Sequence, residues 1–235
     1  MIIEVVIRSL ITAVVAYLIG SLNPAILITK AFTGKDIRTM GSGNAGFTNV
    51  LRSVGTLPAV LTIISDLLKG VIAVMIGWWI FSMMPVYSEV DPFEYMKYGR
   101  YLAGMFVIIG HVFPLYFGFK GGKGVVTAAA LLLVLDWRVF LLSISVFLIV
   151  FAITRIISLG SIIGVAMYPV FTCLFTYFFD FLPKVGTPDE LRFRYVLIST
   201  GCAIIISATV IIMHHENIKR LIRGEEKKIS AKSKK

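Results

Sequence analysis

The sequence is poor in charged residues, which excludes a typical soluble domain. It is also poor in cysteine, which leaves no basis for a redox or cysteine-bound metal site. Charged residues make up 15% of the 235 residues and apolar residues 57%, whereas a soluble domain has about 25% charged residues. The two cysteines, Cys173 and Cys202, both lie in apolar stretches, so we expect them to serve packing. The neighbours His214 and His215 match no zinc-binding spacing. The composition therefore favours a membrane protein and predicts no metal or other cofactor.

What the sequence does contain is long apolar blocks. A hydrocarbon core about 30 Å thick requires about 20 apolar residues of helix. Backbone polar groups must be paired inside that core, so each block is predicted to be helical. We expect an all-α integral membrane protein with about seven transmembrane helices in a single domain, residues 1–225. The predicted helices lie near residues 9–29, 57–83, 101–117, 124–136, 138–154, 157–180 and 195–213.

The fourth block is the weakest of the seven. Its apolar part, Val125 to Leu135, spans only about 16–17 Å as a helix. It either begins inside the preceding loop or forms a re-entrant hairpin with the fifth block, and both alternatives leave the last helix on the same side. The first block is expected to be a true span, because Met1 to Glu4 supply no basic segment of a signal peptide.

The positive charge is distributed unevenly, and this predicts the orientation. The formal net charge is +10, and Lys and Arg in short loops favour the cytoplasmic side. We place the N-terminus outside and the C-terminus in the cytoplasm, in a bacterial inner membrane. The cations that then face inward are Lys30, Lys35, Arg38, Arg52, Lys120, Lys123, Arg155 and every Lys and Arg from Lys219 onward.

The C-terminal tail, residues 226–235, is rich in lysine. We expect it to be disordered and to lie near anionic lipid headgroups, which attract basic segments beside a membrane. Nucleic acid is not an expected partner, since no aromatic or folded reading surface accompanies the lysines.

Three polar, glycine-rich segments fall on the predicted cytoplasmic side. The first motif is GSGNAGFTNVLR, residues 41–52. The second motif consists of GHVFP at residues 110–114 and FKGGKG at residues 119–124. The third motif is HHENIKRL at residues 214–221, with Gly224 and Glu225 behind it. Their shared side predicts one site built from three distant stretches of the chain.

The residue types in these motifs are suited to binding phosphate. Glycines let consecutive backbone N–H groups converge on an anion, and Lys and Arg supply charge that a phosphate matches well. A glycine-rich turn that opens a helix adds the positive end of the helix dipole. Glycine in a single loop often serves only the turn, but three such loops on one face favour phosphate binding.

Two common nucleotide-binding patterns do not fit. Gly41, Gly43 and Gly46 have the spacing of a dinucleotide-binding loop, yet no strand precedes them. The second motif is not a Walker loop, because Phe117 stands in place of the first glycine and Gly124 in place of the final Ser or Thr. The sequence predicts phosphate binding without a nucleotide-binding fold.

The three motifs have the forms GSGNxGxTNVLR, GHxFPxxxxFKGGKG and HxxNIxRLxxGxE. In this order and at these separations they resemble the membrane-bound acyl-phosphate:glycerol-3-phosphate acyltransferases of bacteria, the PlsY type. The resemblance covers the chain to about Glu225. It implies transfer of an acyl group from acyl phosphate, and not from acyl-CoA, to the 1-hydroxyl of sn-glycerol 3-phosphate. The products are 1-acyl-sn-glycerol 3-phosphate (lysophosphatidic acid) and phosphate, in the first committed step of phospholipid synthesis.

The resemblance also implies partners and a location. The active site faces the cytoplasm, membrane lipids surround the acyl chain, and a soluble enzyme that produces acyl phosphate is an expected partner. Acyl phosphate and glycerol 3-phosphate are both anions, so cations are needed to offset their mutual repulsion.

Each motif supplies candidate site residues. The catalytic candidates are Ser42, Lys123 and His214. Ser42 and Lys123 are expected to hold one phosphate, and His214 either orients or deprotonates the attacking hydroxyl. The departing phosphate is the alternative acceptor of that proton. The candidates for binding substrate or phosphate are Gly41, Gly43, Asn44, Thr48, Asn49, Arg52, Lys120, Gly121, Gly122, Asn217 and Arg220.

Three further ionisable residues carry alternative interpretations. His111 heads the second motif at the end of a predicted helix; we expect it to cap backbone carbonyls, with contact to substrate as the alternative. Asp66 and Lys69 are spaced i, i+3 within a predicted span, where they can neutralise each other. Ionisable residues inside a membrane are also functional candidates, but an internal ion pair is the simpler interpretation.

Two other functions are compatible with the composition. An anion transporter would use the basic loops as a vestibule, but transporter sites usually lie near the midplane and often between inverted repeats. No internal repeat is evident, and the phosphate-binding residue types cluster at one face. A non-catalytic scaffold that recruits partners through its basic tail leaves the three motifs unexplained. The sequence therefore favours an enzyme.

Overall fold

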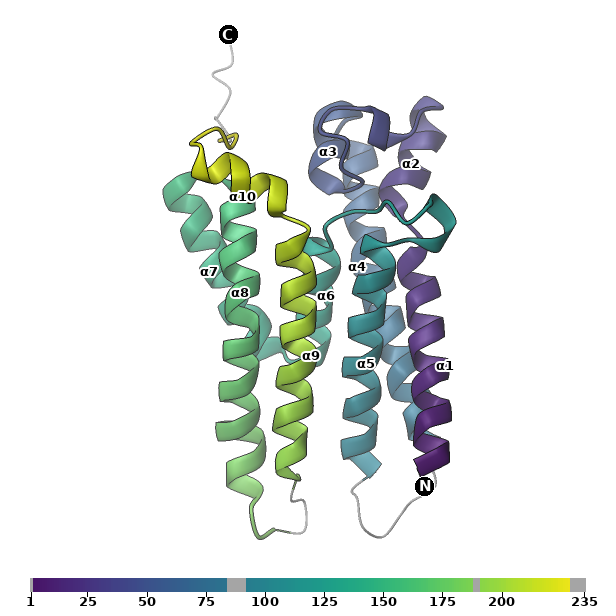
Figure 1. The fold of residues 1–235 in the computed structure, drawn as a ribbon, viewed down its shortest axis with the longest axis vertical. Helices are drawn as coiled ribbons and strands as arrows, with labels where there is room; N and C mark the ends of the chain where they lie inside the picture. The colour runs from purple at the N-terminus through teal and green to yellow at the C-terminus, as the bar shows by residue number, and fades with distance from the viewer. Residues whose placement is uncertain (1, 84–91, 188–190, 229–235) are drawn as a thin grey trace.

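The structure, a computed structural model, describes residues 2–83, 92–187 and 191–228 as an elongated bundle of helices (Figure 1). Its α-helices are α1 (Ile2–Ser21), α2 (Pro24–Thr33), α3 (Phe47–Ser53), α4 (Thr56–Ser82), α5 (Pro92–Val112), α6 (Val125–Leu135), α7 (Trp137–Thr154), α8 (Ile157–Phe175), α9 (Phe193–Ile212) and α10 (His215–Ile222). Short 3₁₀ turns cover Ile37–Thr39, Leu115–Phe117 and Leu182–Lys184, and a π-helical segment, Thr176–Phe181, extends α8.

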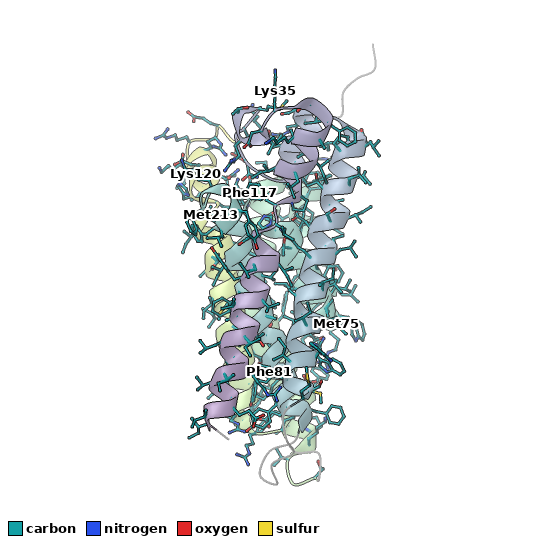
Figure 2. The ribbon with its side chains drawn as sticks, turned by 90° about the vertical axis from the view of Figure 1, so that its right-hand side faces the viewer. Lys35, Met75, Phe81, Phe117, Lys120 and Met213 are labelled. Carbon is teal, nitrogen blue, oxygen red and sulfur yellow. The ribbon has the colours of Figure 1, made fainter. Side chains whose placement is uncertain are left out.

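The bundle has the surface of a membrane protein. Six helical stretches in the described part of the chain are long and apolar enough to cross a bilayer. Figure 2 shows carbon-rich side chains projecting outward along the length of the helices, while nitrogen and oxygen atoms gather toward the two ends. The prediction of an all-α, multi-pass membrane protein is confirmed.

The fourth predicted block differs from a full span. It forms α6, a helix of 11 residues, which is about 16 Å long and too short for a hydrocarbon core of about 30 Å. Helix α6 runs away from the end that carries α10, and α7 returns toward it (Figure 1). Asp136 caps the start of α7 by accepting a hydrogen bond from the Arg138 backbone N–H at 2.9 Å. The described chain therefore has six candidate spans, with the short apolar helix α6 in place of a seventh.

The first predicted block, residues 9–29, is broken into two helices. Pro24 occupies the first turn of α2, and the Asn23 side chain accepts a hydrogen bond from the Ile26 N–H at 3.2 Å. Such a cap followed by proline is a helix-start signal. The break between the two helices was not predicted, because the apolar run continues across it. The third block also begins earlier than predicted, at Pro92, because the charged residues of its first turns were assigned to a loop.

Small residues bring the central helices close together. A Cβ atom on Gly20 would clash with the Val107 carbonyl, and one on Gly110 would clash with the Tyr17 carbonyl, so α1 and α5 pack almost backbone to backbone. Close approach through small residues is how membrane helices associate without a hydrophobic driving force. This contact fixes the end of α5, where the second motif begins.

All three motifs lie at the same end of the bundle. Figure 1 shows α3, the loop between α5 and α6, and α10 at the end where the described chain finishes, while the N-terminus lies at the opposite end. Figure 2 places Lys35, Phe117 and Lys120 at the motif end and Phe81 toward the other end. The predicted gathering of the motifs on one face is found in the fold.

Candidate active site

The first motif is folded around the side chain of Asn49, which is 2% exposed. Its Oδ1 accepts a hydrogen bond from the Ser42 backbone N–H at 2.9 Å. Its Nδ2 donates at 2.9–3.2 Å to the carbonyls of Ile37, Met40 and Asn44. Asn49 was predicted to bind phosphate, but its amide is fully engaged in shaping the loop. This contact leaves Ser42 exposed at the surface of the loop.

Glycines allow the loop to close over Asn49. Gly41 and Gly43 have φ angles of 55° and 72°, a region that glycine adopts without steric cost. A Cβ on Gly41 would also clash with Asn49 Oδ1 and Ser53 Oγ. Asn44 and Thr48 are half-buried beside this turn. Arg52 lies at the exposed end of α3.

In the second motif, Gly121 and Gly122 close a turn against the end of α5. The Gly121 N–H donates to the Val112 carbonyl at 3.1 Å, and the Gly122 N–H donates to the His111 carbonyl at 3.2 Å. These two amides therefore serve the turn and do not form the open anion-binding nest that the glycines suggested. Lys120 is exposed, whereas Lys123 is directed inward to the third motif.

Arg38 lies in the turn Ile37–Thr39, just before the first motif, and joins this turn to the loop of the second motif. Its guanidinium donates to the Phe117 carbonyl at 2.7 Å and to the Lys120 carbonyl at 3.2 Å. Asp36 holds the guanidinium in place through an ion pair of 2.7 Å. The sequence analysis used Arg38 only to assign orientation, because it lies outside the motif.

Lys123 joins the second motif to the third. Its ammonium donates to Asn217 Oδ1, and Asn217 Nδ2 donates to the Glu226 carboxylate at 2.6 Å. Glu226 also accepts hydrogen bonds from Arg220 Nε at 2.6 Å and from Ser158 Oγ at 2.7 Å. These contacts bring Lys123, Asn217 and Arg220 together, although the sequence had suggested that Lys123 shares a phosphate with Ser42.

Glu226 was missed by the sequence analysis. The tail that is predicted to be disordered begins at this residue, and its part from 229 to 235 lies outside the described residues. The Glu226 carboxylate is instead the common acceptor for three side chains of the site. The available signal was that Glu226 supplies the final E of the pattern HxxNIxRLxxGxE. The charge of a lysine-rich tail obscured it.

The electrostatic environment lowers the pKa of Lys123 to about 8. Burial is the main cause, because it disfavours the charged ammonium. The nearby positive charge of Arg220 lowers the pKa further, and the Glu226 carboxylate opposes both effects. Lys123 therefore remains mostly protonated at neutral pH and loses its charge under mildly alkaline conditions.

His214 is 3% exposed and has a defined tautomer. Its Nδ1 lies 2.7 Å from the Val210 carbonyl oxygen, and a carbonyl only accepts, so Nδ1 carries the proton and Nε2 has the free lone pair. Burial lowers the pKa of His214 to about 4, and the hydrogen bond to Val210 partly opposes this shift. The imidazole is therefore neutral near pH 7, with Nε2 available as an acceptor.

His111 lies beneath the Gly121–Gly122 turn of the second motif, beside two charged residues of α4. Lys69 Nζ is 2.8 Å from Asp66 Oδ1, which confirms the predicted ion pair. His111 Nδ1 is 2.7 Å from Lys69 Nζ and 3.3 Å from the same Asp66 oxygen. His111 was expected to cap carbonyls at the helix end, but its ring nitrogen faces this ion pair.

The second motif is thus the link between the other two. Among the described residues, hydrogen bonds join it through Arg38 to the turn just before the first motif and through Lys123 to the third motif, while none joins the first motif to the third. Hollows of about 580 Å³ beside Arg8 and about 420 Å³ beside Arg138 lie away from this end of the bundle. No group of three His, Cys, Asp or Glu side chains within the described ranges is placed to hold a metal ion.

Comparison with known proteins identifies the family. Residues 10–224 match the family model described as glycerol-3-phosphate acyltransferase. The chain belongs to the glycerol-3-phosphate acyltransferase family. It is 37% identical to the glycerol-3-phosphate acyltransferase of Clostridioides difficile (strain 630) over 95% of this chain and 96% of that one. It is 39% identical to that of Prochlorococcus marinus (strain MIT 9215), over 92% and 94% of the two chains.

Solved structures of the glycerol-3-phosphate acyltransferase family share the fold. A crystal structure of PlsY (YgiH), an integral membrane glycerol 3-phosphate acyltransferase, in its glycerol 3-phosphate form, superposes with a TM-score of 0.73 at 33% identity, covering 94% of this chain and 96% of that one. The lysophosphatidic acid form gives a TM-score of 0.71 at 32% identity, with coverages of 94% and 95%. These matches confirm the resemblance to PlsY that the three motifs predicted, and with it an integral membrane acyltransferase.

Proposed function

We propose that this chain transfers an acyl group from acyl phosphate to the 1-hydroxyl of sn-glycerol 3-phosphate and so forms lysophosphatidic acid, the first committed step of phospholipid synthesis. The observation that carries the proposal is the hydrogen bond from Lys123 to Asn217. This hydrogen bond joins two of the three motifs. The solved structures that share the fold are PlsY in its glycerol 3-phosphate form and PlsY in its lysophosphatidic acid form, which supports the proposed substrate and product.

Binding must overcome the repulsion between two anionic substrates. Positive charge at the motif end comes from Arg52 in α3, Lys123 in the loop between α5 and α6, and Arg220 in α10. Charge-assisted hydrogen bonds to phosphate are roughly twice as strong as neutral ones. Ser42, exposed on the loop that Asn49 shapes, donates its hydroxyl to one phosphate. Asn49 contributes by holding this loop, and Glu226 contributes by holding Asn217 and Arg220.

His214 orients the attacking hydroxyl. Its Nε2 accepts a hydrogen bond from the 1-hydroxyl of glycerol 3-phosphate, which points the oxygen lone pair at the acyl carbonyl. A pKa of about 4 makes the imidazole a weak proton acceptor, whereas the conjugate acid of a phosphate dianion has a pKa of about 6. The departing phosphate therefore takes the hydroxyl proton. As the new ester C–O bond forms, the bond between the acyl carbon and the phosphate oxygen breaks, and hydrogen phosphate leaves.

Positioning accounts for the rest of the rate enhancement. Holding hydroxyl and carbonyl in attack geometry is worth roughly 7–11 kcal/mol of effective concentration, and donors directed at the developing oxyanion lower the barrier further. Acyl phosphate is an activated donor, so a protein nucleophile is not needed. The acyl chain stays among the apolar helices while the phosphorylated end meets the soluble acceptor.

We assign the motif end to the cytoplasm of a bacterial inner membrane, with the N-terminus outside. The loops at that end carry most of the Lys and Arg residues, and the positive-inside rule favours this orientation. Glycerol 3-phosphate is then supplied from the cytoplasm, together with acyl phosphate from a soluble enzyme that produces it.

The deciding assay uses purified protein with radiolabelled glycerol 3-phosphate and palmitoyl phosphate, beside a parallel reaction with palmitoyl-CoA. The proposal predicts labelled lysophosphatidic acid with the acyl phosphate alone. Product formation only with palmitoyl-CoA would show that the donor is wrong. Phosphate flux into proteoliposomes without any acyl product would instead indicate a transporter.

A further inference from the structure

Three ionisable side chains form a buried cluster beneath the turn of the second motif. Asp66 and Lys69 lie on α4 and His111 near the end of α5, and they are 2%, 6% and 3% exposed. This Asp66–Lys69–His111 cluster is held mainly by charge, because Asp66 Oδ1 makes no hydrogen bond of good geometry within the described residues although it lies 2.8 Å from Lys69 Nζ. Ionisable groups at such depth are costly, and in membrane proteins they mark functional elements.

Lys69 connects the cluster to the junction between α1 and α2. Its ammonium donates to the Leu22 carbonyl at 2.9 Å and to the Gly20 carbonyl at 3.4 Å. These carbonyls lie where α1 ends and the chain breaks before α2. The next residue, Asn23, donates from Nδ2 to the Ala45 carbonyl of the first motif at 3.5 Å, so Lys69 anchors a segment that contacts the first-motif loop.

His111 connects the cluster to the turn of the second motif. An ammonium only donates, so His111 Nδ1 accepts from Lys69, and the neutral ring carries its proton on Nε2. A Cβ added to Gly122 would clash with His111 Nε2 and with the Ala45 carbonyl oxygen. The imidazole edge therefore lies against the junction of the two loops, directly below the residue that precedes Lys123.

We propose that Asp66 and Lys69 are positioning residues for the acyl transfer: through His111 they hold the Gly122–Lys123 turn in the geometry that binds a substrate phosphate. The inference rests on the proposed function, and neither residue is assigned a contact with substrate. Removing the Asp66 charge leaves the Lys69 ammonium buried without its counter-ion, which is strongly unfavourable. Lys69 then shifts toward the α1 carbonyls, His111 loses its partner, and the turn loosens.

The test compares Asp66→Asn with a matched control, Asp180→Asn. The first keeps the side-chain shape and removes the charge, and the second breaks the ion pair of 2.9 Å to Arg138 at the far end of the bundle. For Asp66→Asn we expect the KM for glycerol 3-phosphate to rise about tenfold with kcat changed less than threefold. Hydrogen exchange in the peptide 113–124 should accelerate, while peptides of α9 remain as in the wild type. The control should change neither quantity.

A folded Asp66→Asn protein with wild-type KM and wild-type exchange in 113–124 would overturn the proposal. If Asp66→Asn does not fold, Gly122→Ala is the second variant, because it leaves the ion pair intact and displaces His111 from the loop side. Gly122→Ala must then raise the KM for glycerol 3-phosphate and accelerate exchange in 113–124. Wild-type values of both quantities in Gly122→Ala would also overturn the proposal. If the wild type does not acylate glycerol 3-phosphate, the proposed function fails, and the exchange measurement alone decides the inference: acceleration in Asp66→Asn supports it and unchanged exchange refutes it.

Discussion

The charge of Lys123 should set the alkaline limit of activity. Burial and the neighbouring Arg220 lower the pKa of Lys123 to about 8. The Lys123 amine is therefore about 90% protonated at pH 7 and about 10% protonated at pH 9. If the charge is needed to bind a substrate phosphate, kcat/KM falls about tenfold between these two values. The second ionisation of the substrate phosphate, near pH 6, is complete in this range and does not contribute.

The assay is the initial rate of lysophosphatidic acid formation between pH 7 and 10, with spontaneous hydrolysis of acyl phosphate subtracted at each pH. Lys123→Arg is the matched variant, because a guanidinium keeps its charge throughout this range. We expect the variant to have lower activity at pH 7, since an arginine does not fit the Asn217 contact as well, but to lose the decline above pH 8. An identical alkaline decline in the wild type and in Lys123→Arg would refute the assignment of the charge to Lys123.

Three further predictions follow from the site. His214→Ala should lower kcat by about 10²-fold, because the attacking hydroxyl loses the acceptor that orients it, while leaving the folded protein intact in size-exclusion chromatography; near-normal turnover would exclude the proposed role. The folded state lowers the pKa of His214 from 6.5 to about 4, so the free energy of unfolding should fall by on the order of 3 kcal/mol as the pH decreases from 6.5 to 4. In an SDS-unfolding titration, His214→Gln should flatten this pH dependence. An equally steep dependence in the variant would contradict the assignment to His214. Arg38→Gln should raise the KM for glycerol 3-phosphate about tenfold, because a charged hydrogen bond to each of two loop carbonyls is lost. Lys35→Gln, at an exposed position at the same end, should leave this KM unchanged. Equal increases in KM for the two variants would show that only net charge matters.

The fold was predictable where a physical rule acts on a single segment. Bilayer thickness and backbone pairing predicted the helices of α4, α7 and α9 to within about two residues. The break at Asn23 was missed because the apolar character continues across it, although the cap and the following proline were visible in the sequence. The length of α6 predicted that it would be a weak span, but its hairpin with α7 depends on the Asp136 turn and its contacts with Arg138.

The site was predictable in its composition and less so in its connections. The residue types of the motifs indicated phosphate binding, and the fold places them at one end of the bundle. The division of labour could not be read from the sequence: Asn49 and Gly121 use their hydrogen-bonding groups to build loops. Arg38 and Glu226 act through partners far away in the chain, and tertiary contacts of this kind leave no local pattern.

Our central claim is that three distant motifs form one anion-binding site at the cytoplasmic face. Single cysteines in place of Ser42, Lys120 and Arg220 test it, one exposed or half-buried position in each motif, in a chain with Cys173 and Cys202 replaced by alanine. An impermeant maleimide is applied from either side of oriented membrane vesicles, with and without glycerol 3-phosphate. We predict labelling of all three from the cytoplasmic side alone, slowed by glycerol 3-phosphate at each position. Labelling of any one of the three from the opposite side would contradict the account.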